Sequence, residues 1–267
     1  MDGDALAAVT HATGAVLATE GLAIHGGPRE LVNGLSLTFA PGEVVAILGR
    51  NGSGKTLTLH TLAGLKQPSR GIVRLNGASL LQLKRRAIAR QLGLLMQDLE
   101  ESFTTTVLEA VLIGRHPHLA LWQWESAADE ALARRTLASV GLEHMAGRNM
   151  DTLSGGEQRR VAVATLLTQE PSIFLLDEPT NHLDPHHQLH VLNLFRSLAN
   201  EGSTVVATLH DPTLAARFAD RVVLLFGDGR WRAGPTREVL TGESLSELYF
   251  TPMLELAAKD RRVFVTA

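Results

Sequence analysis

Runs of apolar residues, each closed by glycine or by polar residues, recur along most of the chain. Short runs of this kind predict buried strands, and the clearest are Glu43 to Leu48, Leu92 to Gln97, Ser172 to Glu178, Ser203 to His210 and Arg221 to Phe226. Segments with helical spacing lie between them, including one from about Lys55 to Ala63. This alternation is typical of an α/β fold built on a parallel sheet.

Two turn signals predict hairpins at the margin of that sheet. Asn76-Gly77 closes one apolar run, and such a pair favours a tight hairpin turn. A Gly-Asp-Gly triplet follows the run that ends at Phe226, and it predicts a last hairpin. Residues 1–14 are small and unpatterned, so we expect them to form a loose N-terminal tail.

The stretch from about Asp98 to Arg160 has a different pattern. The segments from Thr106 to Gly114 and from Asp129 to Gly141 have helical spacing, and no strand pattern stands out between them. We therefore expect a helical subdomain, at about 98–160, inserted into the α/β core.

Composition narrows the class of protein. With 267 residues, 45% of them apolar, the chain can form one large domain or two small ones. Its net charge of −3 gives no global basic field, which argues against a nucleic-acid partner. The absence of cysteine excludes disulfides and thiolate metal sites.

Targeting signals are also missing from the sequence. No Lys or Arg precedes Arg29, so the start lacks the charged region of a signal peptide. No stretch of about 18 or more residues is purely apolar, as a membrane span requires. We expect a cytoplasmic protein that reaches a membrane only through a partner.

A phosphate-binding motif follows the first apolar run. Gly49, Gly54, Lys55 and Thr56 fit the pattern G-x-x-x-x-G-K-[ST] between a predicted strand and a predicted helix. The glycines let backbone N–H groups approach a β-phosphate, and the helix dipole adds to the attraction. The lysine would reach the β- and γ-oxygens, and the threonine hydroxyl can ligate Mg²⁺. The alternative is a chance glycine-rich turn.

Two adjacent carboxylates end another predicted strand. Asp177 stands where a P-loop protein needs a second contact to Mg²⁺, which it would make through water. Adjacent strand residues point to opposite faces, so Glu178 needs a different role, that of general base for the attacking water. The structural alternative for Glu178 is a solvated loop residue or a helix cap.

A second anion site is predicted a hundred residues further on. Ser154 and Glu157 form a capping box, which alone indicates only a helix start. Gly155 and Gly156, however, weaken that start while exposing N–H groups at the positive end of the helix dipole. Because one ATP has one γ-phosphate, a second cradle suggests that two chains face each other head to tail and sandwich two nucleotides.

These motifs, in this order, resemble the ATP-binding cassette (ABC) ATPases over nearly the whole chain. Gly49 to Thr56 resembles Walker A, Leu153 to Glu157 the ABC signature, Ile173 to Glu178 Walker B and Asn181 to Asp184 the D-loop. Gln97 is similar to the glutamine that senses Mg²⁺ and the γ-phosphate, and His210 to the histidine that helps position water.

The resemblance implies a fold and a set of domain limits. It implies a P-loop NTPase (RecA-like) core with a parallel sheet, an N-terminal antiparallel β subdomain and the inserted helical subdomain. The ABC domain would span 15–250, and residues 251–267 would form a C-terminal extension.

The resemblance also assigns site residues, with ATP and Mg²⁺ as cofactors. Catalytic roles fall to Glu178, His210 and Gln97. Mg²⁺ would be held by Thr56, Gln97 and Asp177. Nucleotide contacts fall to Gly49, Asn51, Gly52, Ser53, Gly54, Lys55, Thr56 and His25, with Ser154, Gly155, Gly156 and Asp184 at the dimer seam.

One departure from the family pattern concerns the adenine base. The family usually places an aromatic residue about 25 positions before Walker A to stack on adenine. The segment from Gly21 to Leu31 contains no Tyr, Phe or Trp. His25 is the nearest planar side chain, and an aliphatic contact through Ile24 is the alternative.

The resemblance further suggests the partners and the location. A free cassette of this size most often serves an importer or a separately encoded exporter. The segment after the Q-loop and the stretch from Asp177 to Ala199 look like the subgroup that takes up ferric siderophores, cobalamin and haem. Expected partners are a second copy, transmembrane permease subunits that dock along residues 97–119, and a periplasmic or surface substrate-binding protein. The location would be the cytoplasmic face of the inner membrane.

Alternatives remain open at this point for function and for several polar residues. An exporter cassette or a soluble ABC ATPase without a transport role would carry the same motifs. His182, His186 and His190 have metal-site spacing, but the missing carboxylate and thiolate ligands favour ordinary surface residues. His116 and His118 are expected to shape a loop. Arg159 and Arg160 either contact the nucleotide or lie solvated along their helix, and we expect the second. Trp122 and Trp124 are either partner contacts or local core, and Asp98, Glu100 and Glu101 either interface or solvated loop.

Overall fold

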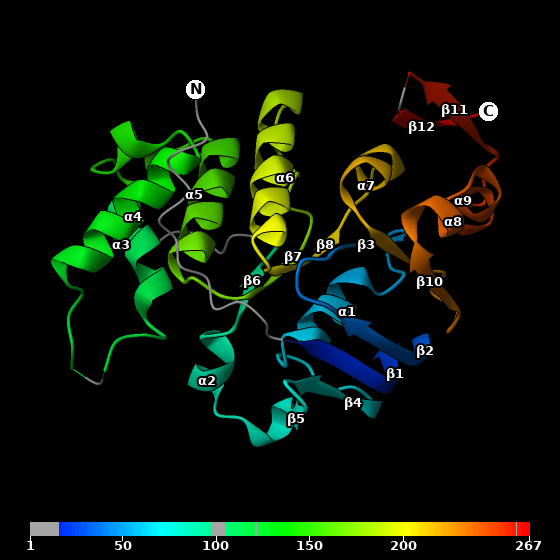
Figure 1. The fold of residues 1–267 in the computed structure, drawn as a ribbon, viewed down its shortest axis with the longest axis horizontal. Helices are drawn as coiled ribbons and strands as arrows, with labels where there is room; N and C mark the ends of the chain where they lie inside the picture. The colour runs from blue at the N-terminus through cyan, green and yellow to red at the C-terminus, as the bar shows by residue number, and fades with distance from the viewer. Residues whose placement is uncertain (1–15, 98–104, 121, 260) are drawn as a thin grey trace.

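The computed structural model describes residues 16–97, 105–120, 122–259 and 261–267. The expected tail at 1–14 and the acidic residues Asp98, Glu100 and Glu101 lie outside these ranges. Figure 1 shows a central sheet between helices, with the helical region, α3 (Val107–Leu112) and α4 (Ala127–Ser139), on one side and the C-terminal end on the other.

The central sheet contains six strands. In spatial order they are β10 (Trp231–Pro235), β9 (Arg221–Leu225), β3 (Val44–Gly49), β8 (Thr204–Thr208), β7 (Ile173–Leu176) and β6 (Leu92–Leu95). All neighbours run parallel except β10, which pairs antiparallel with β9. Strands β3, β7 and β8 are buried along their full length, which explains their continuous apolar sequences. The α/β fold class expected from the sequence is confirmed.

Alternate residues of these strands enter two different cores. Ala46, Phe174 and Val205 pack with the helices on one face, whereas Ile47, Leu175 and Val206 pack toward α1 and the second sheet. The pleat of the strands produces this division, because successive side chains point to opposite faces.

The second sheet is antiparallel and covers α1 (Lys55–Leu62). Its order is β2 (Arg29–Phe39), β1 (Leu17–Gly26), β4 (Arg70–Leu75) and β5 (Ala78–Ser79). The hairpin predicted at Asn76-Gly77 is confirmed: both residues have positive φ, 52° and 79°, and β4 pairs with β5 across them.

The remaining helices surround the central sheet. They are α2 (Arg85–Ala89), α3 (Val107–Leu112), α4 (Ala127–Ser139), α5 (Gly155–Thr168), α6 (Pro185–Asn200), α7 (Pro212–Phe218), α8 (Thr236–Val239) and α9 (Gly242–Tyr249). Short 3₁₀ turns occupy Leu80–Gln82, Ile113–Arg115, Glu143–Met145 and Met150–Thr152. None of the helices in the described ranges is long and apolar enough to cross a bilayer.

Arg115 ties the helical region to the end of α5. Its guanidinium pairs with Asp129 at 2.8 Å and with Glu170 at 2.7 Å, and it also donates to the carbonyl oxygen of Thr168. The Arg115 side chain is only 12% exposed, so these bonds satisfy a charge that would otherwise be costly to bury.

The end of the chain contains a hairpin that the sequence reading missed. The β9–β10 hairpin was predicted as the last one, but β11 (Met253–Ala258) and β12 (Arg261–Thr266) form another. Phe264 anchors it, since its side chain is buried and its backbone N–H donates to Thr213 Oγ1. The prediction failed because the alternation of apolar and charged residues in β11 and β12 is short and mostly exposed.

Candidate active site

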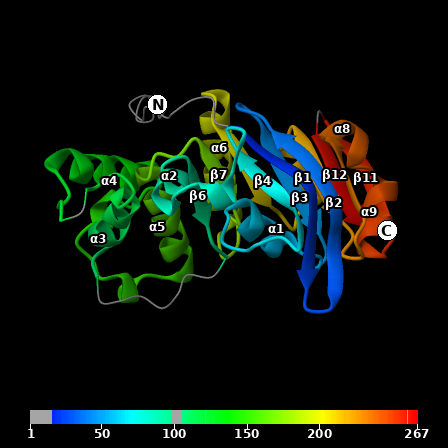
Figure 2. The same cartoon turned by 90° about the horizontal axis from the view of Figure 1, so that it is seen from below.

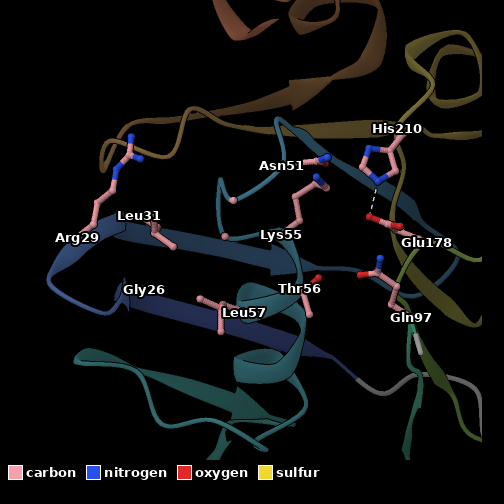
Figure 3. Close-up of a pocket in the computed structure, with 12 residues that line it drawn as sticks. Gly26, Arg29, Leu31, Asn51, Lys55, Thr56, Leu57, Gln97, Glu178 and His210 are labelled. Carbon is pink, nitrogen blue, oxygen red and sulfur yellow. Dashed lines mark hydrogen bonds and ion pairs between the residues drawn. The ribbon is translucent and has the colours of Figure 1, made fainter. Parts of the chain in front are cut away.

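A cavity of about 690 Å³ opens where β3, β6, β7 and β8 end. Parallel strands bring their carboxyl ends to one edge, which is where ligands bind in folds of this kind. Figure 3 shows the side chains that line it. The lining residues are Gly26, Arg29, Leu31, Asn51, Gly52, Gly54, Lys55, Thr56, Leu57, Gln97, Glu178 and His210.

Two glycines of the loop before α1 are required by close approach and backbone conformation. A Cβ at Gly49 would lie 2.3 Å from Ser53 Oγ and 2.6 Å from the carbonyl oxygen of Leu225. Gly54 caps α1 with φ of 100° and makes no side-chain cap, so the first N–H groups of the helix stay available to a ligand. Ser53 is buried and does not line the cavity.

Lys55 enters the cavity from the first turn of α1. Its Nζ donates to the carbonyl oxygens of Gly49 at 2.9 Å and Arg50 at 3.3 Å. Burial lowers the pKa of this ammonium, and the Glu178 and Asp177 carboxylates oppose that shift. Hydrogen bonds therefore hold the Lys55 ammonium in place, but the two carboxylates balance its positive charge only in part. This favours the binding of an anion.

Asp177 and Glu178 are linked through one hydroxyl. Thr208 Oγ1 on β8 donates to Asp177 Oδ1 at 2.7 Å and accepts from the Glu178 N–H at 2.8 Å. Asp177 is completely buried, and its Oδ2 has no hydrogen-bond partner among the described residues. An orphaned carboxylate oxygen, together with the Thr56 hydroxyl and the Gln97 side chain on the cavity wall, is a donor set that suits a hard cation such as Mg²⁺.

Glu178 combines burial with an unusual backbone. Its φ is 48°, in the left-handed region, and the residue is only 6% exposed. Its two carboxylate oxygens contact His210 Nε2 and Asn181 Nδ2. In Figure 3 the Glu178 and His210 side chains face each other beside Lys55 and Gln97. A carboxylate and an imidazole in contact with each other thus stand on the wall of the cavity.

Arg159 lies buried, which corrects the expectation that it is solvated. It is only 2% exposed. Its guanidinium donates to the carbonyl oxygens of Met96, Gln97, Asp177 and Glu178, the last two at 2.5 Å and 2.7 Å. One side chain from α5 therefore clamps the ends of β6 and β7, where Gln97 and Glu178 arise. Arg160 donates to the carbonyl oxygen of Val140 and is only partly buried.

The second predicted phosphate cradle is formed but lies outside the cavity. Ser154 caps α5, and the capping box with Glu157 is confirmed in both directions. Ser154 and Gly155 are exposed, and a Cβ at Gly155 would meet nothing within 4 Å. Ser154, Gly155 and Gly156 do not line the cavity. Asp184 caps the N-terminus of α6, where it accepts a hydrogen bond from the His187 N–H at 3.0 Å, and it is exposed.

The two residues expected to contact adenine, His25 and Ile24, do not line the cavity. The ring of His25 lies with Nδ1 2.8 Å from Ser69 Oγ, and His25 does not line the cavity. Ile24 is buried in the core. Arg29, Leu31 and Leu57 form the wall instead, and the sequence reading did not select them because it sought a planar ring.

The C-terminal segment reaches the P-loop, which the sequence did not indicate. The Arg50 guanidinium lies 3.9 Å from the centroid of the Phe250 ring. Burial, with a smaller contribution from the Asp211 carboxylate, raises the pKa of the neighbouring Tyr249 hydroxyl to about 12.

Three histidines near the predicted motifs have local partners. His118 Nε2 lies 2.9 Å from the carbonyl oxygen of Gln169, and His190 Nε2 lies 2.7 Å from that of Ser139. His187 pairs with Asp184. Trp122 and Trp124 are not core residues, since they are 91% and 86% exposed.

Comparisons with known proteins agree with this geometry. The sequence profile described as "ABC transporter" matches residues 32–181. The hemin import ATP-binding protein of Rhizobium meliloti is 40% identical over 230 residues, covering 83% of this chain and 86% of the relative. The ferric enterobactin transport ATP-binding protein of Escherichia coli is 36% identical over 231 residues, covering 86% and 85%.

Solved structures give the same fold. An inward-facing transporter described as metal-chelate type superposes with a TM-score of 0.83 and 29% identity, covering 95% of this chain and 98% of that one. A dimeric bacterial ABC transporter cassette gives a TM-score of 0.73 with 28% identity, covering 83% and 99%.

Proposed function

Because this chain belongs to the ABC transporter family of ATP-binding proteins, we propose that it is the ATP-hydrolysing subunit of an importer for an iron-siderophore, haem or cobalamin-type chelate. One observation supports ATP hydrolysis in particular: Glu178 and His210 share a cavity wall with Lys55, Thr56 and Gln97. The membership itself agrees with the resemblance seen in the sequence.

The residues of the cavity suit binding of a nucleotide triphosphate. The N–H groups at the start of α1 and the Lys55 ammonium receive the β- and γ-phosphates, and the Arg29, Leu31 and Leu57 wall receives the base. Thr56, Gln97 and Asp177 would hold Mg²⁺, which supplies neutralisation of the phosphate charge. Binding of the nucleotide phosphates offsets the free-energy cost of burying the positive charge of Lys55.

Hydrolysis then depends on Glu178. The Glu178 carboxylate accepts a proton from water as the water oxygen attacks the γ-phosphorus and the bond to the β-phosphate oxygen breaks, leaving ADP and phosphate. His210 contacts the same carboxylate and orients it. Arg159 fixes the backbone from which Gln97 and Glu178 project.

A second copy completes the site. The N-terminus of α5 is exposed at Ser154 and Gly155 and lies outside the cavity of its own chain, so it serves the nucleotide of a partner copy. Asp184, exposed at the start of α6, would lie at the seam. Two-fold symmetry then gives two equivalent ATP sites, which close on binding and reopen after hydrolysis.

The remaining partners follow from the proposed role. Permease subunits would dock along residues 97–119, of which 98–104 lie outside the described residues, and a periplasmic or surface substrate-binding protein would deliver the chelate. The chain would then work at the cytoplasmic face of the inner membrane. The relatives named for hemin and ferric enterobactin support this substrate class. An exporter subunit is the alternative function.

Two experiments test the proposal. For the dimer, the molar mass of Glu178→Gln is measured by light scattering at high protein concentration, with and without ATP and Mg²⁺. We expect a doubling with ATP, because the variant binds without hydrolysing. A monomer at saturating ATP would contradict the shared site.

For the transport role, the tagged chain is extracted gently from native membranes. Recovery of a many-span permease, with a substrate-binding protein encoded beside it, is expected. Recovery of an exporter, or of soluble proteins alone, would contradict the import role but not the proposal that the chain is a dimeric ATPase.

A further inference from the structure

One part of the chain has an extreme charge distribution. The protein as a whole is slightly acidic, with a net charge of −3. Residues 44–97 nevertheless contain nine Lys and Arg and no Asp or Glu. Two of these cations, Arg70 and Arg74, pair with Glu30 and Glu20 on the antiparallel sheet. Four others, Lys84, Arg85, Arg86 and Arg90, stand on or beside α2.

Large apolar side chains lie on both sides of α2. On one side, Leu65 and Leu81 are 55% and 72% exposed. On the other side are the two highly exposed tryptophans, Trp122 and Trp124. Figure 1 shows α2 and β5 along the lower edge of the molecule, and Figure 2 views that edge from below.

Short hydrogen bonds join these residues into one surface. Arg86 Nε and Arg90 Nε each donate to the carbonyl oxygen of Pro117 at 2.8 Å. These two bonds hold the segment that leads to Trp122 and Trp124 against α2. Arg86, Trp122 and Trp124 line a hollow of about 380 Å³.

The other side of α2 is joined in the same way. Arg85 Nη1 donates to the carbonyl oxygen of Gly64 at 2.5 Å. Leu65, Lys66, Leu81 and Arg85 line a second hollow, of about 260 Å³. We call the combined surface the α2 face, made of Leu65, Lys66, Leu81, Lys84, Arg85, Arg86, Arg90, Trp122 and Trp124.

Positive charge on the α2 face is poorly balanced within the described residues. Lys66 and Lys84 are exposed, and the described ranges show no hydrogen bond or ion pair for either ammonium. Glu125 is the one carboxylate among the residues that line the two hollows. The arginines give their donors to backbone carbonyls, which do not cancel their charge.

This combination points to a lipid surface more than to a protein. Protein interfaces are depleted of lysine at their centre, whereas the headgroup region of a bilayer favours tryptophan together with lysine and arginine. We propose that the α2 face binds the anionic phospholipid headgroups of a membrane directly. The proposal goes beyond the import function, because it assigns the chain its own contact with lipid.

The first test uses the full chain and vesicles without any permease. Vesicles of phosphatidylcholine are compared with vesicles that contain phosphatidylglycerol, by co-sedimentation in low and high salt. Binding is expected for the anionic vesicles and is expected to weaken as salt rises, since the Debye length falls to about 3 Å at 1 M. The emission of Trp122 and Trp124 should shift to shorter wavelength on binding. Equal binding to both kinds of vesicle, or to neither, would overturn the proposal.

The second test removes individual groups from the α2 face. Lys66→Gln with Lys84→Gln is expected to weaken vesicle binding about 25-fold, at about fivefold per cation. Trp122→Asn with Trp124→Ser is expected to weaken it about tenfold; asparagine suits position 122 because its φ is 67°. Lys259→Gln and Leu256→Ser, which change exposed residues of the β11–β12 hairpin, are the matched controls and should bind normally.

The outcomes also separate this proposal from the proposed function. Variants that bind vesicles like the unaltered chain, but fail to co-purify with a permease, would show that the α2 face is a protein contact and would overturn the proposal. ATP hydrolysis in solution should be unchanged in all of these variants. If the unaltered chain hydrolyses ATP normally but binds neither kind of vesicle, the lipid contact is refuted and the import function still stands.

Discussion

The two predicted phosphate cradles share a design but not an environment. Each consists of glycines at the N-terminus of a helix, α1 in one case and α5 in the other. The P-loop cradle is surrounded by Lys55, Gln97, Glu178 and His210 from its own chain. The α5 cradle is outside that cavity, and its Ser154 and Gly155 are exposed.

The helix caps differ in the same sense. The α1 N-terminus has no side-chain cap, so its N–H groups are left for a ligand. The α5 N-terminus is capped by Ser154 and Glu157, and it keeps its shape without a ligand. This difference supports the proposal that the α1 cradle holds the nucleotide of its own chain and that the α5 cradle is a preformed surface for a second copy.

The largest expected effect comes from emptying the P-loop cradle. Lys55→Ala should lower ATP hydrolysis by about 10³-fold and weaken ATP binding, because the charge facing the β- and γ-phosphates is lost. Phosphate release and the affinity for a fluorescent ATP analogue are measured. Lys66→Ala, an exposed lysine, is the control and should behave normally. Full activity in Lys55→Ala would contradict the assignment of the cavity.

The next effect sharpens the comparison by damaging the α5 cradle alone. Gly155→Asp should lower hydrolysis about 10²-fold, because a carboxylate repels the γ-phosphate, and leave ATP affinity of the single chain unchanged. Phosphate release and nucleotide affinity are again measured.

A mixing experiment then asks whether the cradles act in trans. Lys55→Ala and Gly155→Asp chains, combined in equal amounts, form mixed dimers in which one composite site is intact. The mixture should hydrolyse ATP faster than either variant alone. No recovery, despite dimer formation, would mean that the two cradles do not serve one nucleotide.

A smaller effect is expected from Arg159, which reaches from α5, the helix of the second cradle, to the backbone of Gln97 and Glu178 beside the P-loop. Arg159→Gln should lower kcat about tenfold with little change in KM, since the nucleotide contacts remain while Gln97 and Glu178 lose their backbone support. Arg159→Lys should recover part of kcat. Arg160→Gln, one position along α5, is the matched control. Steady-state kinetics decide the matter; a pure rise in KM argues against a positioning role.

The smallest effect concerns acid stability of the α5 cradle. Hydrogen bonds from Ser154 lower the pKa of Glu157 below its usual 4.5. A carboxylate with a depressed folded pKa contributes stability above the unfolded pKa and loses it as pH falls. Urea unfolding should therefore show a decline below about pH 4.5 that is slightly flatter in Glu157→Gln, by less than about 1 kcal/mol. A steeper decline in the variant would refute the cap.

The sequence predicted most of the P-loop site but little of what supports it. Motif spacing puts Lys55 at a helix start and Glu178 at a strand end, and both side chains line the cavity, because strand and helix ends are local properties. The burial of Arg159 could not be predicted, because it depends on carbonyl groups that β6 and β7 bring together from distant segments. The same limit explains why the sequence pointed to His25 or Ile24 and did not indicate Arg29: ring chemistry is visible in sequence, whereas the direction of a hairpin is not.

Glu178 occupies a backbone region that suits glycine far better than glutamate. Its carboxylate is also buried beside Asp177, another acidic group. Glycine at this position would relax the backbone and remove a buried charge, so thermal selection without a demand for activity would drift toward an inactive, sturdier protein. Heat resistance alone is therefore a misleading criterion when variants of this chain are screened or engineered.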